Sequence, residues 1–179
     1  MTKKKILFIF LIFFFFNFNK TLVAENNSKI KKPQIVLVGV YINSVNYIDL
    51  KKGLAEIDFY IWFRTKNNPK IFKNIEITNS SDLVISSESK DYFNGEHYYS
   101  ARYKLTAYQN FNFEKFPLDN QEIYFNIESA DFDINSLVFK VDNKNSNIAE
   151  KITRNGYKIH NLKIEVDEKN IYRILEILE

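Results

Sequence analysis

The residues best suited to bind a small molecule alternate along one short segment of the chain. Trp62 and Arg64 fall on the opposite alternation from Ile61 and Phe63. Tryptophan and arginine are enriched where proteins bind partners, because a flat ring and a planar guanidinium combine contact area with directional hydrogen bonds. The same side chains could instead cover a solvated sheet face, with Trp62 tucked under a loop. A binding role and a packing role therefore both stay open for them.

Patterns for catalysis or metal binding are sparse. The chain has no cysteine, which excludes disulfides, thiolate metal ligands and a cysteine nucleophile, and it has no His-Glu-x-x-His, Gly-x-Ser-x-Gly or glycine-rich phosphate loop. The carboxylates of Glu128, Asp131 and Asp133 match no full calcium loop in their spacing, so we expect a solvated acidic loop. His97 and His160 are isolated, and two separate histidines do not make a metal site. We expect no enzymatic activity, no cofactor and no metal.

The first segment of the chain has the pattern of an export signal. Lysines at positions 3–5 precede an unbroken apolar run over residues 6–16, which is shorter than the roughly 20 residues of a membrane-spanning helix. We expect cleavage after Ala24, with an uncleaved membrane anchor as the alternative, and a polar arm over residues 25–33. Without residues 1–24, the chain carries 21 basic and 22 acidic residues, so nucleic acid is not an expected partner. The domain is expected in the periplasm or on the outer face of the cell membrane.

The rest of the chain is patterned for β-strands. Isoleucine and phenylalanine recur at every second position over residues 57–63, which predicts a strand with one face in a core. Residues 35–42 are apolar on both alternations, which predicts a buried strand. Residues 170–179 have helical spacing and fit either a short amphipathic helix or a frayed strand. Short strands with polar breaks indicate an all-β sandwich or barrel. The expected strands are 34–47, 54–64, 71–78, 83–86, 98–108, 121–129, 137–141 and 157–166.

The most specific local pattern is Phe-Glu-Lys-Phe-Pro-Leu-Asp-Asn-Gln at 113–121, directly before an expected strand. An ordinary turn could have this composition, because proline fixes φ and aspartate suits turns. The segment also resembles the signature loop of the pentameric ligand-gated ion channel family, where a Phe-Pro-x-Asp core is followed by Gln and a strand. Animal members flank this loop with two cysteines, whereas prokaryotic members lack them, as does this chain.

Further matches follow the order of the family over roughly residues 34–166. Segments 38–49 and 58–64 resemble its first two strands and the loop between them, although Thr65 stands where the family often has tryptophan. Segments 133–139 and 156–159 resemble the prokaryotic pattern beyond the signature loop. The resemblance implies a twisted immunoglobulin-like sandwich, five copies in a ring, and ligands bound at the subunit seams.

The resemblance also assigns roles by motif position. The candidates for coupling to a pore are Asp49, Phe116, Pro117, Leu118 and Asp119. The candidates for ligand binding are Trp62, Arg64 and Arg102 on the complementary side of the seam, with Ala130, Asp131 and Phe132 on the principal side. Ala130 is a departure, since the family often has an aromatic or bulkier residue there, and an alanine offers no ring to a cation.

Two expectations concern the rest of such a receptor. The chain has no pore helices after residue 24, so we expect residues 34–179 to form a ligand-binding domain that is incomplete at its C-terminus. A membrane is then a partner only through a missing pore domain or an uncleaved N-terminal segment. The competing hypothesis is a stand-alone exported sandwich that binds a sugar or a protein, for which the aromatic-rich stretch 92–108 would supply stacking surfaces.

Overall fold

Two β-sheets make up the compact unit Lys32–Glu179. The computed structural model describes residues 32–114, 120–150, 152–154, 157–166 and 172–178. The expected export signal, most of the polar arm and the motif residues Phe116, Pro117, Leu118 and Asp119 lie outside these described residues. The chain is an all-β sandwich, as the sequence predicts.

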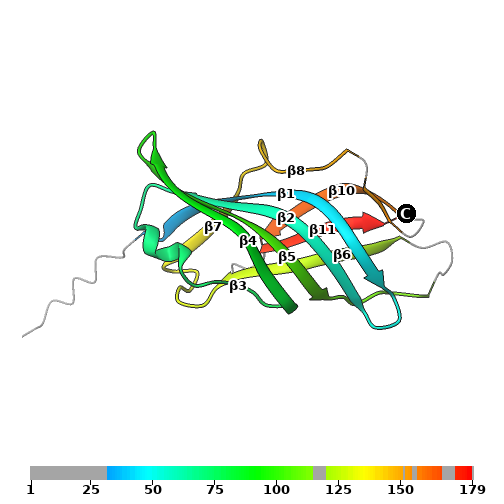
Figure 1. Cartoon of the computed structure of the whole chain (residues 1–179). Helices are drawn as coiled ribbons and strands as arrows, with labels where there is room; N and C mark the ends of the chain where they lie inside the picture. The colour runs from blue at the N-terminus through cyan, green and yellow to red at the C-terminus, as the bar shows by residue number, and fades with distance from the viewer. Residues whose placement is uncertain (1–31, 115–119, 151, 155–156, 167–171, 179) are drawn as a thin grey trace, which may run out of the picture. The chain divides into compact units, whose positions relative to one another are not determined.

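The first sheet has the strand order β4-β5-β2-β1-β7, with β8 also paired to β1. β1 and β2 form an antiparallel hairpin, as do β4 and β5, and β2 also pairs antiparallel with β5. By contrast, β7 and β8 run parallel to β1. Figure 1 shows β1, β2, β4 and β5 side by side. Its strands are β1 (Gln34–Asp49), β2 (Leu54–Thr65), β4 (Ser80–Phe93), β5 (Glu96–Tyr108), β7 (Leu137–Val141) and β8 (Asn147–Ile148).

The second sheet has the order β3-β6-β11-β10-β9, and all of its pairs are antiparallel. Its strands are β3 (Ile75–Ile77), β6 (Gln121–Ser129), β9 (Ile152–Arg154), β10 (Tyr157–Val166) and β11 (Tyr172–Leu178). The helix-or-strand alternative for residues 170–179 is thereby settled as a strand, because β11 pairs with β10 on one side and with β6 on the other. Pairing along both edges overrides the helical spacing of this segment.

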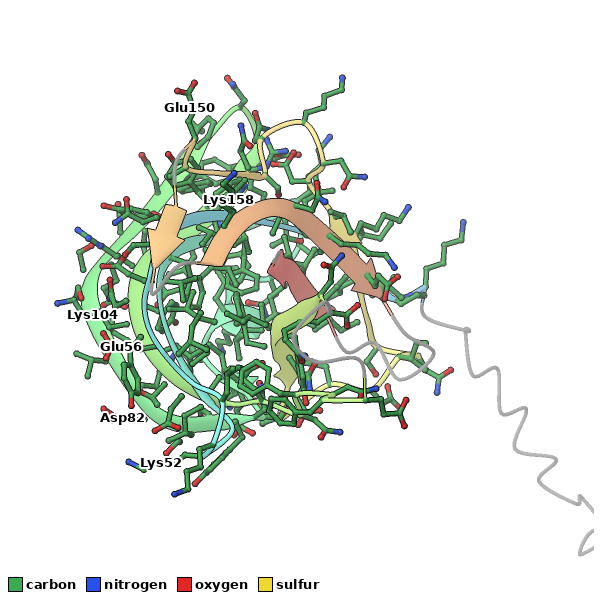
Figure 2. All side chains as sticks on the ribbon, turned by 90° about the vertical axis from the view of Figure 1, so that its right-hand side faces the viewer. Lys52, Glu56, Asp82, Lys104, Glu150 and Lys158 are labelled. Carbon is green, nitrogen blue, oxygen red and sulfur yellow. The ribbon has the colours of Figure 1, made fainter. Side chains whose placement is uncertain are left out.

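Aromatic and branched side chains fill the space between the sheets. Ile57, Phe59, Ile61 and Phe63 are all at most 2% exposed, which confirms the predicted one-sided pattern of β2. The ring of Phe59 lies 4.3 Å, between centroids, from the ring of Phe125 on β6, so the two sheets meet directly. Figure 2 shows the opposite side of the first sheet, where Glu56 and Lys104 point outward.

Some strand predictions are corrected. Residues 35–42 are not buried on both faces, since Ile35 is 44% exposed and Tyr41 36% exposed. The expected strand 71–78 is a 3₁₀ helix, η1 (Pro69–Phe72), followed by β3, because Pro69 starts the helix and the Asn68 side chain accepts the Lys70 backbone N–H (3.0 Å).

The expected strand 83–86 is only the centre of the 14-residue β4. The hydrophobic pattern missed its length because β4 pairs only with β5 among the described strands, and nearly all of its residues are exposed. Asn94 and Gly95 form the turn between β4 and β5. Both residues have positive φ (52° and 78°), as a two-residue hairpin turn requires.

Candidate functional site

Three of the candidate ligand-binding residues lie on the outer face of the first sheet. Trp62 and Arg64 are successive outward residues of β2, and Arg102 lies on β5 opposite Tyr60. They face outward because the alternate positions of β2 are committed to the core. The sheet therefore brings these side chains to one surface, but their contacts differ.

Trp62 is fixed by its neighbours in the sheet. It lies opposite Gly39 on β1, and a Cβ at position 39 would be 2.2 Å from the indole ring. The ring therefore covers bare backbone that any other residue would obstruct. At its edge, Trp62 Nε1 donates a hydrogen bond to Asp142 Oδ2 (3.1 Å). These contacts favour the packing interpretation for Trp62.

Asp142, which the sequence argument did not single out, is the centre of this cluster. Its carboxylate is 6% exposed and accepts hydrogen bonds from Trp62 and from Asn145 Nδ2, which lies 2.9 and 3.0 Å from its two oxygens. It also forms an ion pair with Arg64 Nη2 (3.1 Å). The backbone carbonyl of Asp142 accepts from the Ser146 hydroxyl (2.8 Å). The only sequence signal was a lone aspartate between a short strand and turn residues.

Arg64 is only partly engaged by this cluster. Besides the contact with Asp142, its Nη1 lies 4.0 Å from Glu96, and its Nε is buried without a hydrogen-bond partner. The side chain borders a pocket of about 370 Å³, which has an apolar wall and a polar rim. The pocket is lined by Pro33, Ile35, Leu37, Arg64, Thr65, Lys66, Asn67 and Glu96. A guanidinium beside apolar side chains suits a small carboxylic acid.

Arg102 is fully occupied by a neighbouring side chain. Its Nε and Nη2 each donate to one oxygen of Asp58, both at 2.8 Å, and its guanidinium lies 5.4 Å from the centre of the Tyr60 ring. The hydrogen bonds to the Asp58 carboxylate raise the pKa of Arg102. This bidentate pair uses the planar fork that a ligand carboxylate would need, so a structural role suits Arg102 better than the predicted binding role.

The principal-side candidates lie on the connection that leaves the second sheet after β6. Ala130 N donates to Asn74 O (2.9 Å), and the Asn74 side chain donates to Asp131. Phe132 packs partly buried against the core. Hydrogen bonds from Ser136 and Asn135 lower the pKa of Asp133. No group of three or more metal-ligating side chains occurs among the described residues.

Asp49, the remaining coupling candidate, closes the turn between β1 and β2. Its carboxylate accepts from the Lys52 backbone N–H (2.9 Å) and from the Tyr47 hydroxyl (2.9 Å), and these bonds lower the pKa of Asp49. The backbone N–H of Gln109, just after β5, donates to Gly53 O in the same turn (2.8 Å). The turn is thereby joined to the start of the segment that carries the Phe-Pro-x-Asp motif.

A second pocket, of about 420 Å³, lies between η1 and the β4–β5 hairpin. The His97 ring lies 4.7 Å from the Tyr92 ring, so the wall is largely aromatic. Its lining residues are Pro69, Phe72, Lys90, Asp91, Tyr92, His97 and Tyr98. His97, which the sequence shows only as an isolated histidine, therefore lines a pocket.

No protein-family model matches this chain, and no curated protein matches it at a significant level. None of the described helices is long and apolar enough to cross a membrane. The interpretation of the site therefore depends on its own geometry and on the motif resemblance.

Proposed function

We propose that this chain is the extracellular ligand-binding domain of a homologue of the pentameric ligand-gated ion channels. The observation that carries the proposal is the hydrogen bond from Gln109 N to Gly53 O. It joins the β1–β2 turn to the segment leading into the Phe-Pro-x-Asp motif, and these are the two regions that the resemblance assigns to coupling. The contact continues the β2–β5 ladder one step beyond the Leu54–Tyr108 pair, so the strand register brings the two motif-bearing segments together.

The pocket beside Arg64 supports the ligand-binding half of the proposal. Because Nη1 of Arg64 has only a distant partner, Glu96 at 4.0 Å, the guanidinium keeps a donor for a ligand in this pocket. We infer that the ligand is a small organic acid. In an assembled receptor, a ligand with unequal affinity for the closed and open states would shift the balance between them.

The test combines assembly with binding. The purified full chain is examined by sedimentation across a wide concentration range and titrated calorimetrically with small carboxylic acids and amines. We expect self-association and weak acid binding that Arg64→Gln abolishes. The matched control is Lys104→Gln, which removes an exposed cation from the same sheet face and leaves the pocket lining intact. A chain that stays monomeric and binds none of these compounds would overturn the proposal.

A stand-alone sugar-binding protein is the second candidate, favoured by the aromatic pocket between η1 and the β4–β5 hairpin. Aromatic faces stack against the apolar face of a sugar ring, while Asp91 and Lys90 at the wall could bond its hydroxyls. Titration with neutral monosaccharides separates the two candidates. Sugar binding that Tyr92→Ala abolishes and Arg64→Gln leaves unchanged would favour the second.

A further inference from the structure

One edge of β6 is completed by side chains where no strand lies. On this edge β3 pairs only with residues 127–129 of β6, so the part nearer Gln121 has no strand partner on that side among the described residues. The exposed edge of a sheet leaves backbone N–H and C=O groups to be satisfied. Here the Thr78 backbone N–H reaches the Asn126 carbonyl (3.1 Å), and carboxamide side chains satisfy the Asn126 N–H and both backbone groups of Tyr124.

Gln109 mimics one rung of a β-ladder. Its Oε1 accepts the Tyr124 backbone N–H (2.9 Å), and its Nε2 donates to the Tyr124 carbonyl (2.9 Å). Asn79 continues the pattern, because its Oδ1 accepts the Asn126 N–H (3.0 Å) and its Nδ2 donates to the Tyr124 carbonyl (3.1 Å). Asn79 Nδ2 also donates to Tyr108 O (3.0 Å), which ties β5 of the first sheet to β6 of the second.

Gln121 makes the same kind of pair on the other side of the connection. Its Oε1 accepts the Asn112 N–H (2.9 Å), and its Nε2 donates to the Asn112 carbonyl. Gln121 is 5% exposed and Gln109 is 9% exposed, so water competes little for these bonds. We call Asn79, Gln109 and Gln121 the carboxamide clasp.

The clasp also holds the β1–β2 turn through the backbone of Gln109. Gly53 has φ of +63°, and a Cβ at this position would lie 2.8 Å from the Gln109 carbonyl oxygen. Glycine therefore allows the close approach that lets Gln109 N reach Gly53 O. A change in the position of Gln109 should therefore alter the structure of the β1–β2 turn.

We propose that the carboxamide clasp holds the β1–β2 turn and both ends of the 109–121 connection as one unit, so that Gln109 and Gln121 are positioning residues for the surface these segments form. That this surface couples to a pore rests on the proposed function, whereas the clasp itself does not.

A carboxamide suits this task because it donates and accepts at once without carrying charge. Gln109→Leu removes both bonds to Tyr124, and Gln109→Glu keeps the acceptor but sets a carboxylate against the Tyr124 carbonyl. Each buried backbone group that loses its hydrogen-bond partner lowers the free energy of unfolding. The two variants therefore share a defect at neutral pH but differ in acid, where a neutral carboxyl group can donate again.

The test is backbone amide exchange of the full chain, followed residue by residue. In Gln109→Leu we expect the amides of Tyr124, Asn112 and residues 51–54 to exchange roughly tenfold faster or more than in the unaltered chain. The control is Thr65→Val, which removes another buried side chain's bond, from Thr65 Oγ1 to Ile35 O (2.9 Å), at the other end of β2. It should leave residues 51–54 unchanged.

Gln109→Glu provides the rescue. At pH 7 it should behave like Gln109→Leu, and its excess exchange over the unaltered chain at the same pH should shrink as the pH falls below about 4.3, the ordinary value for glutamate. Unchanged exchange at residues 51–54 in both Gln109 variants, an equal effect of Thr65→Val, or no recovery in acid would each overturn the clasp. Failure of ligand binding would leave this result untouched, so the two proposals fail separately.

Discussion

Two buried aspartates each hold an arginine on the outer face of the first sheet, and they do so differently. The Asp58 carboxylate pairs with Arg102 through two parallel bonds of 2.8 Å. Asp142 is shared by Trp62, Asn145 and Arg64, and Arg64 gives it a single nitrogen at 3.1 Å. Arg102 therefore forms a two-bond pair with its aspartate, whereas Arg64 gives its aspartate one contact.

The difference shows that the availability of an arginine for a ligand depends on the contacts that its guanidinium already makes, and not on its residue type. Both arginines are candidates by position, and both are about equally exposed, at 33% and 26% of the side chain. Arg64 borders a pocket of about 370 Å³ and has a buried nitrogen without a hydrogen-bond partner. We therefore expect Arg102 to matter for stability and Arg64 to matter for binding.

The largest expected effect is that of Arg102→Ala. It would strand the Asp58 carboxylate, which is only 6% exposed, and breaking such a pair from one side should cost about 3 kcal/mol of unfolding free energy. Urea unfolding measures it, with Lys104→Ala as an exposed control on the same strand. Equal, small costs for both variants would refute the assignment.

A smaller effect is expected for Asp142→Ala, at about 2 kcal/mol, because the variant removes an acceptor but leaves Arg64 near water and Glu96. Trp62 is the only tryptophan of the chain, so its fluorescence reports on the site directly. We expect the emission to move to longer wavelength as the indole loses its partner. Asp142→Asn keeps one acceptor oxygen, so its emission should lie between that of the unaltered chain and that of Asp142→Ala. Unchanged emission in both variants would contradict the proposed contact between Trp62 and Asp142.

The sequence predicted the strands that have one face in the core. The alternation over residues 57–63 placed β2 correctly, and the bounds of β6, β7 and β10 agree with expectation. The sequence-based prediction failed where pairing with other strands determines the secondary structure of a segment. β11 is a strand because both of its edges are paired, and β4 extends through charged residues because β5 supplies its hydrogen bonds.

The sequence predicted on which face the candidate residues lie, but not which contacts they make. Alternation put Trp62 and Arg64 on one face, yet their shared partner Asp142 lies far along the chain, and no local pattern announces it. The role of Gly39 becomes clear only from the register of β1 and β2, which places it under the indole ring of Trp62. Contacts of this kind depend on strand pairing, which a single sequence specifies weakly.

The smallest expected effect on stability is that of Glu96→Gln, and it separates the two arginines most sharply. Glu96 lies 4.0 Å from Arg64 Nη1, and both side chains are about one quarter exposed, so the pair should contribute less than about 0.5 kcal/mol. Removing its charge should instead free the guanidinium and strengthen binding of a small carboxylic acid roughly threefold. Glu88→Gln, which alters an exposed carboxylate outside this pocket, should change neither quantity. If Glu96→Gln weakened acid binding, or destabilised the fold as much as Asp142→Ala, then Arg64 would be a structural residue like Arg102.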